Sequence, residues 1–252
     1  MRIAIFSDVH GNLTALEAVL ADIDRHAPDA IVFAGDLCLF GPRPAECLRL
    51  VRDRRFPAVV GNTDAWLAGR AQPPDKHAAT MAWTQARFLP DDTAWLGRLP
   101  FGLRFAPTAE ADDDLLIVHA NPRNWDDIVF PAEADQLAQW GHVRQPDAEL
   151  EPLFSGLTAA VVAYGHLHIP GVRPWGGLTL LNVSSVSMPG DGDGRAKYAL
   201  VEWQAGRWSA THHRVAYDVG AEADAFRAHQ PPRWQEALAA IEADGYYYPQ
   251  KI

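Results

Sequence analysis

The chain has 252 residues, enough to bury one sizeable core, and its 48% hydrophobic and 21% charged residues are ordinary for a globular protein. The formal net charge of -10 argues against a nucleic-acid partner, because proteins that grip polyanions present basic surfaces. No apolar run approaches the ~18 residues of a membrane span, and the short first stretch is not typical of a signal peptide, so we expect a cytoplasmic protein without a membrane partner.

The first two-thirds of the chain alternates short apolar runs with amphipathic stretches, which is the α/β pattern. A helix is expected from Leu13 that ends before Pro28, and Asp91 is expected to cap the helical turn that holds Trp95. Strands are predicted at residues 2–6, 30–33, 58–60, 115–118 and 159–164, and further helices at 45–51, 64–98 (broken at Pro73-Pro74 and Pro90) and 131–140.

After residue 165 the apolar period changes to two, which indicates hairpins. They are predicted at 171–175 with 178–183, and at 197–203 with 208–215. Residues 221–243 are expected to be helical with a Pro231-Pro232 interruption, followed by an aromatic tail at 246–248. We therefore predict one domain over 1–252 with about 219–252 as a C-terminal helical appendage, and two facing sheets flanked by helices.

Potential metal ligands follow five successive predicted strands. The ends of strands in an open α/β sheet are where ligands bind, because the loops there converge on one crevice. Two residues that are two positions apart in an extended segment point to the same side, so the first and last pairs can each address one cluster. The side chains are Asp8 and His10, then Asp36, then Asn62, then His119, then His166 and His168.

Each of these short motifs has a simpler explanation when it is taken alone. An isolated Asp-x-His occurs without a metal, a Gly-Asp or Gly-Asn is usually a turn, and a histidine at the end of a strand is usually satisfied by hydrogen bonds. All five motifs at strand ends in this order favour a metal site instead. Carboxylate, imidazole and amide oxygen together suit a borderline divalent ion.

The motif set resembles the calcineurin-like metallophosphoesterase superfamily over about residues 1–200. The family signature of Asp-x-His, Gly-Asp, Gly-Asn-His-Asp/Glu, a lone His and Gly-His-x-His is matched by Asp8-Val9-His10, Gly35-Asp36, Gly61-Asn62-Thr63-Asp64, His119 and Gly165-His166-Leu167-His168. The resemblance implies a four-layer α-β-β-α sandwich of two mixed sheets. It also implies that Asp8, His10, Asp36 and His168 hold one metal and that Asp36, Asn62, His119 and His166 hold the other.

The resemblance further implies a metal-dependent hydrolase of small phosphate esters. Two cations roughly 3.5–4 Å apart lower the pKa of a bridging water, so hydroxide attacks phosphorus directly and no protein nucleophile is needed. The expected cofactors are two divalent ions, Mn²⁺ first, with Fe, Zn, Co or Ni as alternatives. The residues expected to serve catalysis are Asp36, Asn62, Thr63 and Asp64.

Thr63 departs from the family, in which many members carry histidine at this position. A threonine hydroxyl donates hydrogen bonds but is no general acid at neutral pH, and losing such an acid typically costs ~10²–10⁴ in rate. The sequence also resembles a bacterial branch in which this histidine is often missing and whose members are often described as phosphodiesterases. We therefore predict a phosphodiesterase of small diesters, cyclic nucleotides included.

Three further residues are candidate substrate contacts with equally simple alternatives. Asn12 could reach a phosphate oxygen or cap the helix that starts near Leu13. Asn121 lies in the loop after His119 and could line the pocket, and Arg123 could clamp a phosphate or be a solvated loop arginine.

The competing functions are a phosphomonoesterase or dinucleoside-polyphosphate hydrolase, a non-catalytic scaffold, which the filled ligand set disfavours, and a nuclease, which the acidic charge disfavours.

Overall fold

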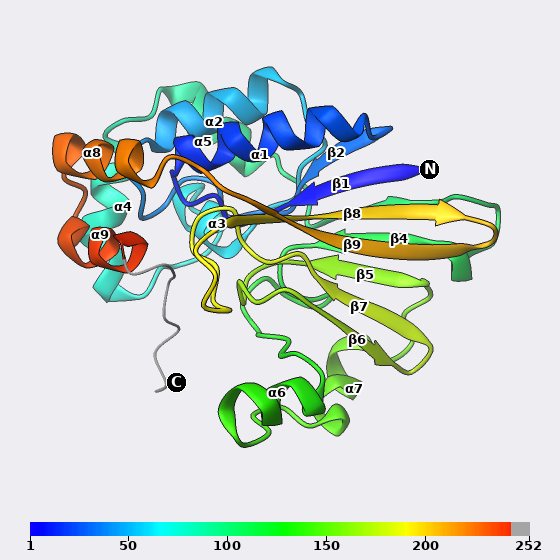
Figure 1. Ribbon diagram of the computed structural model, residues 1–252. Coiled ribbons are helices and arrows are strands. Elements are labelled where there is room, and N and C mark those ends of the chain that lie inside the picture. Colours follow the sequence, from blue (N-terminus) through cyan, green and yellow to red (C-terminus); the bar gives the residue numbers. More distant parts are fainter. Residues whose placement is uncertain (243–252) are drawn as a thin grey trace.

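The computed structural model of the protein describes residues 1–242. The fold is built on two sheets that face each other (Figure 1). The first sheet has the order β2-β1-β8-β9; β1 and β2 are parallel, and the remaining pairs are antiparallel. Its strands are β1 (Arg2–Phe6), β2 (Ala30–Phe33), β8 (Ala196–Gln204) and β9 (Arg207–Val215).

The second sheet has the order β3-β4-β5-β7-β6. Strands β4, β5 and β7 run parallel, and the edge strands β3 and β6 are antiparallel to their neighbours. The strands are β3 (Gly102–Phe105), β4 (Leu115–Val118), β5 (Val161–Tyr164), β6 (Gly171–Trp175) and β7 (Leu178–Asn182).

Helices cover the outer faces of both sheets (Figure 1). Within the described residues they are α1 (Leu13–His26), α2 (Pro44–Asp53), α3 (Asn62–Leu67), α4 (Ala78–Gln85), α5 (Pro90–Gly97), α6 (Glu133–Trp140), α7 (Glu151–Phe154), α8 (Val219–His229) and α9 (Trp234–Glu242). No helix among them is long and apolar enough to cross a bilayer.

Three apolar layers hold the sandwich together. Along β1, Ala4 and Phe6 pack against the helices of the first sheet, whereas Ile3 and Ile5 pack between the two sheets. This alternation follows from the period of two in a strand, and it lets one short apolar run serve two layers. A third cluster, which includes Phe154 of α7, covers the outer face of the second sheet. The α-β-β-α layering is therefore confirmed.

Helix α1 illustrates how local sequence sets the element boundaries. Asn12 caps it, because its side-chain oxygen accepts a hydrogen bond of 2.9 Å from the Ala15 amide. The helix ends at a left-handed Ala27, directly before Pro28. The expected cap and the expected end are both confirmed.

Two expectations about single elements are wrong, and one strand was missed. Residues 58–60 form no strand, since only Ala58 pairs with Phe33 in an isolated bridge. Asp91 lies inside the first turn of α5; the cap position is Leu89, whose amide donates 2.8 Å to the Asp92 carboxylate. Strand β3 was not expected, because its short run, Gly-Leu-Arg-Phe, contains a glycine and an arginine and lacks alternation. The aromatic tail at 246–248 lies outside the described residues.

Candidate metal centre

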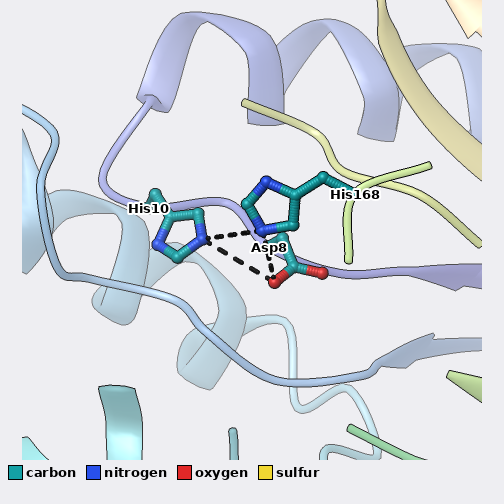
Figure 2. Close-up of side chains that lie close together, drawn as sticks. All are labelled: Asp8, His10 and His168. Atoms are coloured by element: carbon teal, nitrogen blue, oxygen red, sulfur yellow. Dashed lines mark hydrogen bonds and ion pairs between the residues drawn. The ribbon is translucent and has the colours of Figure 1, made fainter. Parts of the chain in front are cut away.

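Two histidines and a carboxylate from distant parts of the chain meet beyond the ends of β1 and β5 (Figure 2). His10 Nε2 lies 3.3 Å from His168 Nε2, and Asp8 Oδ1 lies 3.0 Å from His168 Nε2 and 3.7 Å from His10 Nε2. The three side chains, here called cluster A, are buried.

Backbone carbonyls decide which imidazole nitrogens of cluster A carry a proton. His10 Nδ1 lies 3.2 Å from the Leu39 carbonyl oxygen, and His168 Nδ1 lies 2.8 Å from that of Met188. A carbonyl only accepts, so each Nδ1 donates and each Nε2 of the neutral ring presents a lone pair. Two lone pairs and a carboxylate oxygen then face one point, which is an arrangement that a cation stabilises.

A second group, cluster B, consists of Asp36, His119 and His166. His119 Nε2 lies 3.2 Å from His166 Nδ1 and 3.5 Å from Asp36 Oδ1. The opposite nitrogens again meet backbone carbonyls, since His119 Nδ1 lies 2.9 Å from Ala34 and His166 Nε2 lies 2.8 Å from Asp126. The free lone pairs therefore point inward in cluster B as well.

The Asn62 amide tests whether cluster B fits a metal. Its side-chain oxygen lies 3.1 Å from His119 Nε2, and the same position is 3.0 and 3.3 Å from the two Asp36 oxygens. An amide nitrogen at this position would donate hydrogen bonds to these acceptors, whereas an amide oxygen at this position would be a ligand for a cation held between the groups. The donor set of imidazoles, carboxylate and amide oxygen fits a divalent ion.

Asp36 of cluster B also faces cluster A. Its Oδ1 is 3.5 Å from His119 Nε2 in cluster B, and its Oδ2 is 3.9 Å from His10 Nε2 in cluster A. One carboxylate thus presents one oxygen to each group of lone pairs. This is the geometry of a residue that could bridge two cations.

Burial and neighbouring charges shift the pKa values of the side chains in the centre. Burial alone would raise the pKa of Asp8, but His168 and His10 outweigh it and hold this pKa well below its usual range. Burial opposes a charge on His168, yet Asp8 raises its pKa. Burial and His119 lower the pKa of His166 to about 4, so this imidazole is neutral at neutral pH and keeps its lone pair.

The backbone is strained where it carries these side chains. A positive φ is uncommon in residues other than glycine and costs of order 1–3 kcal/mol when the surroundings enforce it. The loop positions are enforced by hydrogen bonds, since the amides of Val9 and His10 both donate to the Asp36 carbonyl, at 2.9 and 3.1 Å. Left-handed φ occurs at Asp8 (57°), His10 (49°), Asp36 (66°), His166 (64°) and His168 (64°).

A sequence profile of the calcineurin-like phosphoesterase superfamily domain matches residues 1–206. The chain belongs to this superfamily. A metallophosphoesterase from Sphaerobacter thermophilus has 28% sequence identity and a TM-score of 0.73, covering 97% of this chain and 100% of its own. A hypothetical protein from Pyrococcus horikoshii, 17% identical over 95% of this chain and 97% of its own, has a TM-score of 0.76 and shows the fold. An uncharacterized protein from Methanocaldococcus jannaschii is 27% identical, over 92% of this chain and 94% of its own.

The family expectation is therefore confirmed, and the protein is a metallophosphoesterase, a hydrolase of phosphoric esters. The family implies divalent metal ions, and clusters A and B are candidate sites for them. The helices α8 and α9 follow the matched residues, and they contribute to the same region. A cavity beside His10 is lined by Phe40 and Met188 and by Phe226 and Ile241 of these helices.

The other predicted residues of the phosphoesterase lie around the two clusters in different roles. Asp64 is buried, and its carboxylate accepts the amides of Asp36 (2.8 Å), Leu37 (3.0 Å) and Gly61 (3.0 Å). Burial and the Asp36 charge raise the pKa of Asp64 to about 6. Thr63 is buried, and its hydroxyl has no hydrogen-bond partner within residues 1–242. Asp64 thus holds the loop of Asp36 in place.

The three predicted substrate contacts are all engaged elsewhere. Asn12 is the buried cap of α1. Asn121 uses its amide within its own loop, accepting from the amides of Arg123 and Asn124 at 2.8 and 3.0 Å. The exposed Arg123 donates 2.7 Å to the Ser155 carbonyl. A role in substrate binding stays a prediction for each of them.

Sequence reasoning missed residues 182–185, at the end of β7, which support the loops that carry Asp8 and His168. Asn182 donates 2.8 Å to the Gly165 carbonyl, Ser184 donates 2.8 Å to that of His168, and Ser185 donates 2.9 Å to that of Asp8. The signal was present, because these polar residues also follow a parallel strand.

Proposed function

We propose that this metallophosphoesterase hydrolyses small phosphodiesters, cyclic nucleotides among them, with two divalent ions, Mn²⁺ first. The observation that carries the proposal is the Asp36 carboxylate, which offers one oxygen to each cluster of inward-facing lone pairs. The residues that would hold the ions are Asp8, His10, Asp36, Asn62, His119, His166 and His168.

When two such ions are bound, they supply a water that is acidic near neutral pH and they neutralise phosphate oxygens. The chain's own contribution is to fix the groups that face the reacting phosphate. Backbone carbonyls set the tautomers of His10, His119 and His168. Asp64 holds the amides on both sides of the site, so Asp36 does not have to reorganise during the reaction.

Thr63 favours a diesterase, because members of the bacterial branch that the sequence resembles often lack the histidine of this position and are often described as phosphodiesterases. The Thr63 hydroxyl is buried and cannot protonate a leaving group at neutral pH, so hydrolysis should depend on esters whose leaving group needs little assistance. The apolar lining of the cavity beside His10, with Phe40 and Met188, would also accept a second organic group on the phosphate. A monoester has only one such group.

The test compares two substrates with the same leaving group. The purified chain, loaded with Mn²⁺, is assayed on bis-p-nitrophenyl phosphate and on p-nitrophenyl phosphate, and kcat/KM is expected to be higher for the diester. A higher value for the monoester would refute the diesterase proposal and favour a monoesterase or a dinucleoside-polyphosphate hydrolase. Bound metal without turnover of either ester would indicate a scaffold.

A further inference from the structure

A third group of metal-ligating side chains lies away from clusters A and B, where α1 ends against β9. It consists of Asp22 and His26, one turn apart on α1, and His213 on the edge strand β9. Asp22 Oδ2 is 3.8 Å from His26 Nε2 and 4.0 Å from His213 Nδ1. The two imidazole rings meet edge to face, with centroids 4.5 Å apart.

We propose that Asp22, His26 and His213 form a third metal site, which binds Zn²⁺ or a similar borderline divalent ion and ties the end of α1 to β9. Two imidazoles and one carboxylate are a donor set that zinc accepts, with a fourth position left for water. This inference does not depend on the proposed phosphodiesterase activity.

The distances require only a small closure of the side chains. Tetrahedral zinc with ligands at about 2.0–2.1 Å places neighbouring ligand atoms about 3.3 Å apart. The separations of 3.8 and 4.0 Å from Asp22 Oδ2 to the two imidazole nitrogens exceed this value by less than 1 Å, and all three ligand atoms lie within 4.8 Å of one another. All three side chains are partly exposed, at 16% for Asp22, 35% for His26 and 22% for His213, so an ion can reach them and they can move.

A fully buried tyrosine already orients two of the three ligands. The Tyr198 hydroxyl donates 2.8 Å to Asp22 Oδ2, and its ring stacks on His213 with the planes at 10° and the centroids 4.8 Å apart. Outer contacts of this kind fix ligand orientation in metal sites.

Arg25 is the group that competes with a metal. It pairs with Asp22 Oδ1, the other carboxylate oxygen, and its side chain is 68% exposed. An exposed pair of this type contributes little to stability, so a bound cation can displace the guanidinium without a large cost. The oxygen that faces both imidazoles is therefore accessible to a metal.

The test measures how much zinc the full-length protein binds per chain. Wild-type, His26→Gln, His213→Gln and double-variant chains are dialysed against the same buffered Zn²⁺ at pH 7.5, and bound zinc is measured per chain. Both single variants and the double variant are expected to bind one equivalent less than the wild type, because each breaks the same site. His229→Gln, at the end of α8, is the matched control and should bind as the wild type does.

Uptake by clusters A and B is common to all the chains and cancels in the comparison. Cobalt absorption provides a second readout, since a four-coordinate Co²⁺ band in the wild type should be absent from both single variants. The proposal is overturned if either variant binds as much zinc as the wild type. It is also overturned if the double variant loses two equivalents, or if His229→Gln loses one, because either result indicates independent surface histidines.

Discussion

The sharpest prediction concerns Gly61, which must lack a side chain for Asp36 to occupy its position. A Cβ atom at residue 61 would lie 2.1 Å from Asp36 Oδ1 and 2.4 Å from the Asp36 amide nitrogen. Ordinary carbon–oxygen contacts begin at about 3.3 Å. Gly61→Ala therefore has to move the Asp36 carboxylate, or the loop that carries it, by about 1 Å. The φ of Gly61 is -93°, so the substitution adds no left-handed strain and its effect is purely steric.

Two consequences follow from that displacement. Overpacking of a buried site costs about 1–3 kcal/mol, and each kcal/mol lowers Tm by roughly 2–4 °C in a chain of this size. A misplacement of about 1 Å can cost on the order of 10² in rate, so kcat/KM on the diester should fall by that factor. Because Asp36 faces both clusters, the affinity for both ions should fall as well.

Substitutions at two further glycines provide a comparison and a control. Gly165→Ala would place Cβ 2.2 Å from Asp8 Oδ2, so it should displace the carboxylate of cluster A. Gly171→Ala meets nothing within 4 Å and is the matched control. Metal content after dialysis, thermal unfolding and diester hydrolysis are compared for the three variants. If Gly61→Ala behaves like Gly171→Ala in all three measurements, the close packing of Gly61 on Asp36 is refuted.

Three other predictions concern the metals, Thr63 and the docking of α8. Removing metal with a chelator should abolish diester hydrolysis, and Mn²⁺ should restore it; activity that survives complete removal would exclude the proposed centre. Thr63→His should raise kcat/KM on an alkyl phosphate monoester, whose alkoxide leaving group needs a proton, by about tenfold or more by supplying a general acid, and an unchanged rate in a folded variant contradicts the role assigned to this position. Glu222 of α8 pairs with Arg43, and burial raises the pKa of its carboxyl. The folded state therefore binds this proton more tightly than the unfolded state does. The contribution of Glu222 to stability is thus greatest at low pH and declines as pH rises through the raised pKa. In urea unfolding, the stability lost in Glu222→Gln should therefore be larger at pH 5 than at pH 8, and an equal or opposite change would refute this assignment.

Local sequence predicted most of the elements, and the reasons for its failures are physical. The strand at 2–6 and the helix from Leu13 carry strong apolar periods and clear end signals, and both are observed. Residues 58–60 are as apolar as a strand, but only Ala58 finds a partner, because pairing depends on the position of Phe33. Local signals also could not predict that β8 pairs with β1, since β8 lies almost 200 residues away and runs antiparallel to it.

The candidate centre was also predictable from the sequence only in part. The residue types and their order along the chain were readable, because every ligand except Asn62 follows a strand and the parallel strands of a sheet end at the same edge. The roles of Asn121 and Arg123 were not readable, because they depend on which loop atoms lie within hydrogen-bond distance.

By itself, the sequence determined the layered α/β class, the family and the set of groups offered to a metal, since these depend on periodicity and on the chemistry of single residues. Tertiary structure alone decided which imidazole nitrogens face inward, and that His213 of β9 meets His26 of α1. The physical reason is that hydrogen-bond partners and ligand geometry are set by distances between segments that no local pattern encodes.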